Sequence, residues 1–395
     1  MSKELTGNAL ILLGTLETGG SETKFVRLAQ RFKRQRRPIH VAYLGPPESL
    51  LPELEGIATV NLGRRGKWSL RAFRALSSYV KKHSITTIVA VNFYPLAYAI
   101  PLILLRRTPL PRVVVSINTS EIQSAKERAF MRLYVPLLKR CEKIVFGSDR
   151  QRRIWLKKYN LPECRTCVIY NGVDGSIFDR NAIEQSRESV RESLDIDTNA
   201  TVIVCVGRLR PEKAHQNLLM AIAVLQKDFD IAPIVMLVGD GEERAAIEDR
   251  ARQLGVWHQI RMVGSTNDVR PFLVAADVFA LTSTAVETFS NAALEATSMG
   301  LPVVISDVGG AGEMFPAGSS GTIYPRDDIA ALTRALAENI EVVLSGLFDS
   351  IAARSRVLRD FSVDAMDAAW SGVISATDDS GCTPQAPPAN DCGDV

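Results

Sequence analysis

The chain has 395 residues, of which 46% are hydrophobic, and this length and composition can supply the cores of two α/β domains. The net charge of +3 hides an asymmetry, because residues 1–180 carry 31 Lys and Arg against 13 Asp and Glu, while the remainder carries 16 against 31. The two parts therefore have net charges of +18 and −15. This split predicts two domains with different partners, and the partner of the basic domain should be anionic.

The apolar and cysteine patterns argue against a membrane-spanning, secreted or zinc-binding protein. The longest apolar run, residues 93–105, is too short to span a membrane and contains two prolines. The polar start of the chain does not resemble a signal peptide, so we expect a cytoplasmic protein. Cys164 and Cys167 form a C-x-x-C pair without a second pair or a histidine cluster, so we expect six free thiols and no metal site.

Strand-like apolar runs alternate with helical periodicity through the first half of the chain. This alternation predicts a parallel, doubly wound sheet. The predicted strands are residues 9–13, 39–43, 87–91, 113–117 and 143–146, and the predicted helices lie near 21–36, 69–82, 95–107, 124–140 and 149–159. A glycine turn, Gly19 and Gly20, follows the first strand, and Asn118 follows the fourth.

The second half repeats the pattern after a polar segment, residues 181–200, that we interpret as a connector. Its predicted strands are residues 201–206, 234–238, 260–263, 278–281 and 303–305, and its predicted helices lie near 267–275, 290–300, 329–344 and 361–374. Arg208 and Lys213 follow the first of these strands, a spacing that chance could also produce. Residues 376–395 are poor in apolar residues and are predicted to form a disordered tail.

The most informative stretch is residues 284–313. Glu287 lies in a polar turn after a buried strand, Ser290 or Asn291 can cap the helix that follows, and Glu295 lies within that helix. The free N–H groups of such a helix start favour a phosphate group. A second strand then leads to a glycine turn, residues 309–312, so two carboxylates, a helix N-terminus and a glycine turn should meet at the carboxyl ends of adjacent parallel strands.

This stretch resembles the donor-site signature of family 4 glycosyltransferases, retaining enzymes of the GT-B fold. Seven residues separate Glu287 from Glu295, in a frame that ends with a Gly-Leu-Pro-Val-Val strand and a Gly-Gly turn closed by a glutamate. The resemblance extends over nearly the whole chain apart from the tail. It implies an α/β protein with two Rossmann-like domains facing each other across a cleft.

The resemblance also implies roles for particular residues. Arg208 and Lys213 would hold the diphosphate of the donor, Glu287 the sugar hydroxyls and Glu295 the ribose hydroxyls; otherwise the two glutamates are solvated carboxylates. Asn118 stands where many relatives have a histidine, and since an amide does not titrate, Asn118→Ala should leave the shape of the pH profile unchanged. The remaining substrate-binding positions implied are Gly19, Gly20, Gly241, Gly264, Phe289, Ser290, Asn291 and Gly310.

The implied domains are residues 1–180 for the acceptor, the connector 181–200, residues 201–358 for the nucleotide sugar, and a helix, 359–375, that returns to the first domain. The implied reaction is retaining, metal-independent hexosyl transfer from a UDP- or GDP-linked sugar, without a cofactor, to an acceptor such as a lipid-linked saccharide. A sugar-nucleotide epimerase or hydrolase of the same fold is the alternative, and it would consume donor without acceptor. A non-catalytic sugar-nucleotide binding protein is a third reading.

A basic, amphipathic segment suggests a membrane partner. On a helical wheel, residues 67–82 place Trp68, Phe73 and Leu76 on one face and lysines and arginines on another. That apolar face could equally pack on its own sheet. The charge of residues 1–180 independently favours peripheral binding to an anionic membrane surface, and no nucleic-acid-binding motif accompanies it.

Overall fold

The computed structural model describes residues 8–66, 68–104, 110–119, 125–285, 287–317 and 319–375, with side chains omitted for 125–129. The predicted tail, residues 376–395, lies outside the described residues. The chain forms two compact units. The first runs to Tyr170 and resumes at Met366, and the second spans Asn171–Ala365.

The first unit is built on a parallel sheet of seven strands in the order β3-β2-β1-β4-β5-β6-β7. Its central strands are buried on both faces, which explains their continuous apolar runs. The strands are β1 (Asn8–Leu13), β2 (Ile39–Tyr43), β3 (Ala58–Asn61), β4 (Ile85–Val91), β5 (Arg112–Ile117), β6 (Lys143–Phe146) and β7 (Thr166–Val168). Its helices are α1 (Gly20–Arg34), α2 (Leu70–Lys82), α3 (Phe93–Leu104), α4 (Ala125–Leu138), α5 (Asp149–Tyr159) and most of α14 (Val363–Ser375).

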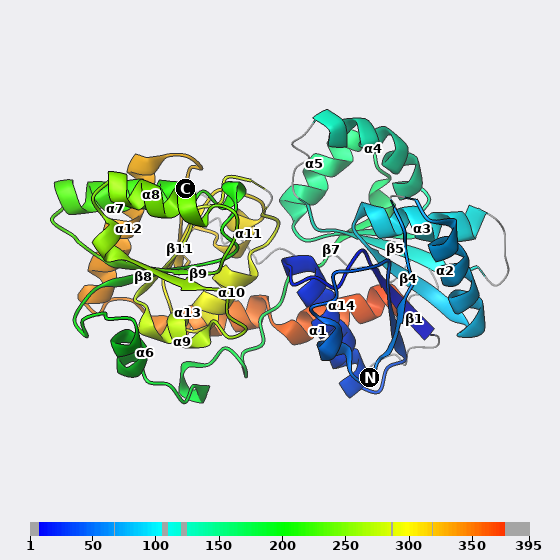
Figure 1. Ribbon diagram of the computed structural model, residues 1–395, viewed down its shortest axis with the longest axis horizontal. Helices are drawn as coiled ribbons and strands as arrows, with labels where there is room; N and C mark the ends of the chain where they lie inside the picture. The colour runs from blue at the N-terminus through cyan, green and yellow to red at the C-terminus, as the bar shows by residue number, and fades with distance from the viewer. Residues whose placement is uncertain are drawn as a thin grey trace, which may run out of the picture. The chain divides into compact units, whose positions relative to one another are not determined.

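Helix α14 packs with α1 in this unit (Figure 1). Trp370, which is fully buried, meets Phe25 edge-on with ring centroids 5.1 Å apart. Arg31 forms two hydrogen bonds, of 2.6 and 2.9 Å, with the buried carboxylate of Asp367. Arg37 donates to Ser371.

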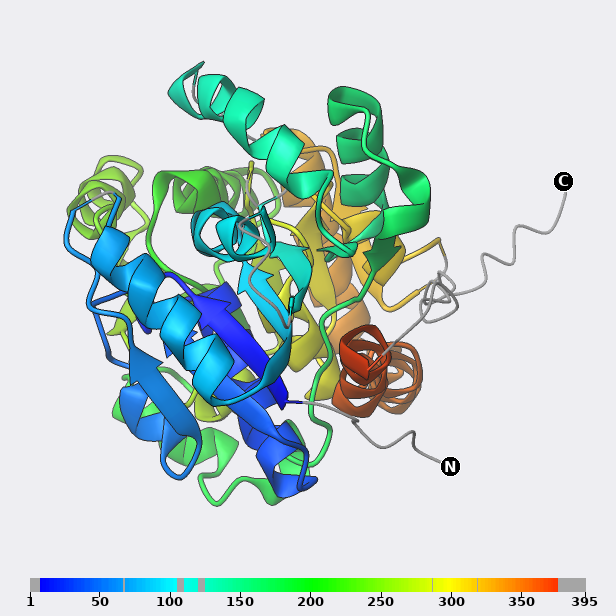
Figure 2. The same cartoon turned by 90° about the vertical axis from the view of Figure 1, so that its right-hand side faces the viewer.

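The predicted amphipathic segment is a helix whose apolar face belongs to the core. Ser69 caps α2 by accepting a hydrogen bond from the N–H of Ala72, so Trp68 precedes the helix and is not part of its face. Ala72 and Leu76 are buried, and Phe73 packs against the same cluster. Figure 2 shows α2, in light blue, crossing in front of the sheet. Of the two interpretations given above, packing of this apolar face on its own sheet is therefore confirmed, and a face free to bind a membrane is excluded for α2.

The second unit holds a parallel sheet of six strands in the order β10-β9-β8-β11-β12-β13. Figure 1 shows α7, α8 and α12 on one side of this sheet and α9 and α13 on the other. The strands are β8 (Val202–Val206), β9 (Ile234–Val238), β10 (Ile260–Gly264), β11 (Val278–Leu281), β12 (Val303–Ser306) and β13 (Gly321–Tyr324). The helices are α6 (Arg187–Ser193), α7 (His215–Asp228), α8 (Arg244–Gln253), α9 (Arg270–Ala275), α10 (Asn291–Ser298), α11 (Ala311–Met314), α12 (Ile329–Leu344) and α13 (Ser350–Asp360).

The polar segment that we interpreted as a connector is anchored to the second unit. Helix α6 places Arg187 and Arg191 against Asp277, with nitrogen–oxygen distances of 2.5 and 2.9 Å. Arg191 is 1% exposed and also donates to the carbonyl oxygens of Thr198 and Ala200. A buried arginine with this many acceptors fixes its surroundings, so the segment is ordered despite its polar composition.

Candidate functional site

Two of the predicted catalytic residues meet in an ion pair. Lys213 ends the loop after β8, Glu287 lies in the loop after β11, and the Lys213 ammonium is 2.5 Å from a carboxylate oxygen of Glu287. Ser283 donates to the same oxygen at 3.3 Å. The side chains of Lys213 and Glu287 are 23% and 16% exposed, so the pair is shielded but can still be reached from solvent.

Backbone contacts hold these two loops together. The N–H of Thr284 donates to the carbonyl oxygen of Glu212 at 2.9 Å. The hydroxyl of Thr282 donates to the carbonyl oxygen of Lys213, also at 2.9 Å. Ser306, at the end of β12, donates to the carbonyl oxygen of Ser283 at 2.5 Å. Three neighbouring strands therefore fix the ion pair through the loops that follow them.

The surroundings of Lys213 favour the charged form of its side chain. Burial lowers its pKa, but the charge and hydrogen bond of Glu287, with the charge of Glu212, outweigh burial and raise the pKa above the ordinary value. The neighbouring His215 is 2% exposed, and burial together with the charge of Lys213 lowers its pKa to about 4. Near neutral pH this site thus combines a lysine cation with a neutral imidazole.

The predicted helix start is confirmed. Ser290 is the N-cap of α10, and its hydroxyl accepts a hydrogen bond from the N–H of Ala293 at 3.2 Å. Asn291 is the first helical residue, and Glu295, partly exposed, lies one turn further on. The side chain of Phe289 faces inward, 3% exposed, with its ring centroid 5.1 Å from that of Phe361, and its carbonyl oxygen accepts a hydrogen bond from Asn171 at 2.7 Å, so the ring is not available to a ligand.

The glycine turn after β12 closes against the Glu287 loop. Gly310 donates its N–H to the carbonyl oxygen of Thr288 at 2.8 Å. Sequence reasoning chose Gly310, but Gly309 is the position that requires glycine: its φ is +60°, and a Cβ there would lie 2.2 Å from the carbonyl oxygen of Glu287. The signal was present in the Gly-Gly pair, but the sequence alone does not say which glycine touches the glutamate loop.

The other predicted glycines of this unit follow neighbouring strands. A Cβ on Gly241 would lie 2.4 Å from the carbonyl oxygen of Leu209, in the loop that also carries Arg208. Gly264 has a φ of +83° and open space around it, and its carbonyl oxygen accepts from Gly239 at 2.9 Å. Arg208 has an exposed side chain. All the site residues predicted for the second unit thus follow strand ends of one sheet, as ligand sites in open α/β sheets do.

The residues predicted in the first unit follow β1 and β5. Gly19 caps α1 in extended conformation, and a Cβ on Gly20, the first residue of that helix, would meet no atom within 4 Å. Asn118 is partly exposed, and its backbone N–H donates to the side chain of Asn92 at 3.0 Å. Its side-chain oxygen lies 3.2 Å from the Lys24 ammonium and 3.4 Å from the hydroxyl of Ser116.

Sequence reasoning missed Lys24, which lies on a helix face that otherwise reads as apolar. The side chain is 9% exposed, and burial lowers its pKa to about 8. A titrating group therefore lies beside Asn118. The expectation that Asn118→Ala leaves the shape of the pH profile unchanged no longer follows, because removing the amide oxygen removes an acceptor that favours the charged form of Lys24.

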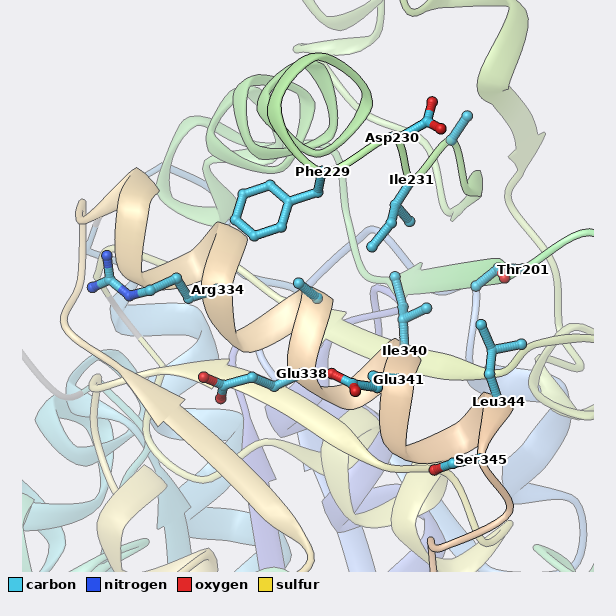
Figure 3. A pocket seen from close by; sticks show the side chains of 12 residues that line it. Thr201, Phe229, Asp230, Ile231, Arg334, Glu338, Ile340, Glu341, Leu344 and Ser345 are labelled. Carbon is cyan, nitrogen blue, oxygen red and sulfur yellow. The ribbon is translucent and has the colours of Figure 1, made fainter.

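An open cavity of about 920 Å³ lies elsewhere on the second unit (Figure 3). It is lined by Thr201, by the turn at Phe229 and Asp230, and by α12 from Arg334 to Ser345. Thr201 directly precedes β8, so this cavity opens at the amino end of a strand whose carboxyl end leads to Lys213. It is separate from the candidate site.

Two absences concern the residues that the structure describes. In that part of the chain, no cluster of three or more His, Cys, Asp or Glu side chains is arranged to bind a metal ion. No helix within the same ranges has the length and hydropathy needed to cross a membrane.

Two family models match the chain: Glycosyl transferases group 1 over residues 186–342 and Glycosyltransferase Family 4 over residues 18–176. An uncharacterized glycosyltransferase of Methanocaldococcus jannaschii is 29% identical over 197 residues, 49% of this chain and 50% of the relative. The lipopolysaccharide core biosynthesis glycosyltransferase LpsE of Rhizobium meliloti is 34% identical over 146 residues, 37% and 41% of the two chains. The matched region thus spans about half the length of these relatives or less.

The crystal structure of Anabaena HepE in complex with UDP-glucose superposes with a TM-score of 0.80 at 21% identity, covering 93% of this chain and 99% of that one. This likeness and the two parallel sheets define a protein of the GT-B fold with two Rossmann-like units. The two family models together match most of the chain and overlap both sets of site residues. Each unit thus matches a glycosyltransferase family: Glycosyltransferase Family 4 in the first unit and Glycosyl transferases group 1 in the second.

Proposed function

We propose that the protein is a retaining glycosyltransferase that moves a hexose from a nucleoside diphosphate to a saccharide acceptor, without a metal ion. The observation that carries this proposal is the Lys213–Glu287 pair, held beside the N-terminus of α10 by three strand-end loops. Departure of a nucleoside diphosphate builds up negative charge. Fixed cations and helix N–H groups can stabilise that charge in place of a metal.

Each residue then has a distinct part in this mechanism. Lys213 compensates the charge on the leaving diphosphate, and Arg208 grips it with a planar fork. Glu287 orients Lys213 and accepts hydrogen bonds from sugar hydroxyls, while Glu295 accepts those of the ribose. Ser290 satisfies the N–H of Ala293, which leaves the earlier N–H groups at the start of α10 to donate to a phosphate oxygen. The departing phosphate takes the acceptor's proton, so the acceptor attacks the anomeric carbon from the same face of the sugar that the phosphate leaves.

The donor is a UDP- or GDP-linked sugar, and UDP-glucose is the first to test because the HepE structure contains it. A thermal-shift screen against UDP, GDP and their sugars tests the assignment. A ligand at a hundred times its dissociation constant stabilises a protein by roughly 2.7 kcal/mol, and Lys213→Ala should abolish the shift. If no nucleoside diphosphate raises the melting temperature of the wild type, the donor site is assigned wrongly.

The acceptor is a lipid-linked saccharide used in cell-surface polysaccharide or glycolipid synthesis, reached from the inner face of the membrane. Helix α2 does not support membrane binding, because its apolar face is buried. Arg31 and Arg37 do not support it either, because they form hydrogen bonds with α14. Helices α4 and α5, adjacent in Figure 1, instead expose apolar as well as basic side chains, and Leu133 and Ile154 are 66% and 41% exposed. The exposed basic residues of these helices and of the residues directly flanking them are Arg132, Lys139, Arg140, Arg150, Arg153, Lys157 and Lys158.

A further inference from the structure

An aromatic cluster in the first unit has no part in the site described above. It consists of Trp68, in the connection from β3 to α2, with Tyr94 and Tyr98 in α3 and Arg64 in the same connection as Trp68. Because β3 and β4 both end here, the cluster lies at the carboxyl edge of the first sheet. Open parallel sheets bind ligands at that edge.

The cluster presents an indole ring that is exposed and yet held in place. Trp68 is 60% exposed, and its ring centroid lies 6.3 Å from that of Tyr98, at an interplanar angle of 27°, and 6.0 Å from that of Tyr94. The Tyr98 hydroxyl accepts a hydrogen bond from the N–H of Ser69 at 3.0 Å, which fixes the chain next to the indole. Tyr98 itself is 3% exposed, so the ring against which Trp68 packs is part of the core. Ordering the ring in advance lowers the entropy cost of binding a flat, apolar surface.

A cation adjoins this ring system. The Arg64 guanidinium stands 5.0 Å from the centre of the Tyr94 ring and donates to the Tyr94 hydroxyl at 3.1 Å and to the carbonyl oxygen of Gly66 at 3.0 Å. Its Nε is buried and has no hydrogen-bond acceptor among the described residues. Both hydrogen bonds come from Nη1, no acceptor for Nη2 lies among the described residues, and the side chain is partly exposed, so Nη2 can reach an anionic group of a ligand.

We propose that Trp68, Tyr94, Tyr98 and Arg64 form a subsite for a sugar ring that carries a carboxylate or phosphate group. The C–H face of a pyranose matches an aromatic ring, and a planar guanidinium matches the two oxygens of a carboxylate or phosphate. The inference rests on the proposed transferase function for its role, which is to bind an acidic acceptor. Its test uses binding alone.

The experiment is saturation-transfer NMR and affinity titration of the full chain with glucuronic acid, glucose 6-phosphate, glucose and inorganic phosphate. Transfer to the ring protons of both acidic sugars is expected, with affinity about tenfold above that for glucose, since charge-assisted hydrogen bonds are roughly twice as strong as neutral ones. A preference for one acidic sugar identifies the anionic group. Equal binding of glucose and the acidic sugars, or no binding, overturns the proposal.

Matched variants separate the two parts of the subsite. Arg64→Met should remove the preference for acidic sugars, and Trp68→Ala should remove the transfer to ring protons. Arg74→Met and Leu70→Ala, changes at exposed positions of α2, should have neither effect. Unaltered UDP binding by all four variants keeps this test independent of the donor site.

Two outcomes would give the cluster a different function and contradict the inference. If inorganic phosphate binds as tightly as glucose 6-phosphate and Trp68→Ala changes neither affinity, Arg64 is an anion site without a sugar ring. If Trp68→Ala leaves sugar binding intact but weakens co-sedimentation with anionic vesicles, the indole is a membrane anchor.

Discussion

The Lys213–Glu287 pair can be tested directly by mutation. Lys213→Ala and Arg208→Ala should each lower kcat by a hundredfold or more, because losing one group that stabilises charge in the transition state costs on the order of 3 kcal/mol. Melting temperatures without ligand should change much less. Arg210→Ala, an exposed arginine in the same loop, is the matched control and should retain activity. Normal turnover in both variants would remove the diphosphate assignment.

Lys24 gives a pH-dependent prediction for stability. Its pKa is about 8 in the folded protein and 10.5 as the ordinary value, so below pH 8 both states are protonated and burial of the charge costs about 3 kcal/mol. Between pH 8 and 10.5 the folded state releases its proton first, and the cost disappears. Lys24→Met should therefore be more stable than the wild type at pH 7, with the advantage shrinking toward pH 10.5.

Chemical unfolding of both proteins at several pH values measures this difference. Lys33→Met, at an exposed position of the same helix, is the control for the substitution itself. A constant gap between wild type and Lys24→Met would mean that the ammonium keeps its solution behaviour on folding.

Among the elements, the turn at Gly309 has little conformational freedom. With φ at +60° and Glu287 backbone where a Cβ would lie, Gly309→Ala must displace the glutamate loop. We expect a loss of on the order of 1–2 kcal/mol in the free energy of unfolding and a fall in kcat of at least tenfold. Gly312→Ala, in α11 directly after this turn and with open space around it, should lower neither quantity. Equal effects of the two substitutions in kinetics and unfolding would contradict this reading.

The accuracy of the sequence analysis varies with burial. Strands such as β8 and β11 were predicted because they are buried on both faces, and the site motifs directly follow them. The edge strands β3 and β13 were missed, since most of their residues are only partly buried and give no continuous apolar run. Helix α13, which buries only Ala353 and Val357, was missed as well. Burial does not explain every miss, because strand β7 and helices α7 and α8 were also not predicted, although β7 and much of α7 are buried. Contacts between distant segments, such as Lys24 with Asn118, leave no local pattern.

For the whole molecule, the charge division predicts binding to anionic membranes. Basic residues near such a surface contribute about 1 kcal/mol each, and salt screens the effect. The protein should co-sediment with anionic vesicles at low salt and not with neutral ones. Lys157→Glu with Lys158→Glu, in the last turn of α5, should weaken binding more than Lys81→Glu with Lys82→Glu, in the last turn of α2. Binding that ignores salt and lipid charge would instead favour a soluble anionic acceptor.

We propose above that this chain transfers a sugar from a nucleoside diphosphate with retention of anomeric configuration. Proton NMR of the wild-type protein with UDP-glucose and an acceptor follows the donor, the released UDP and the first-formed product in one sample. We expect a product whose anomeric proton has the same small coupling as that of the α-linked donor, formed at least a hundredfold more slowly by Lys213→Ala. An inverted first product, or consumption of the donor at the same rate without acceptor, would contradict it.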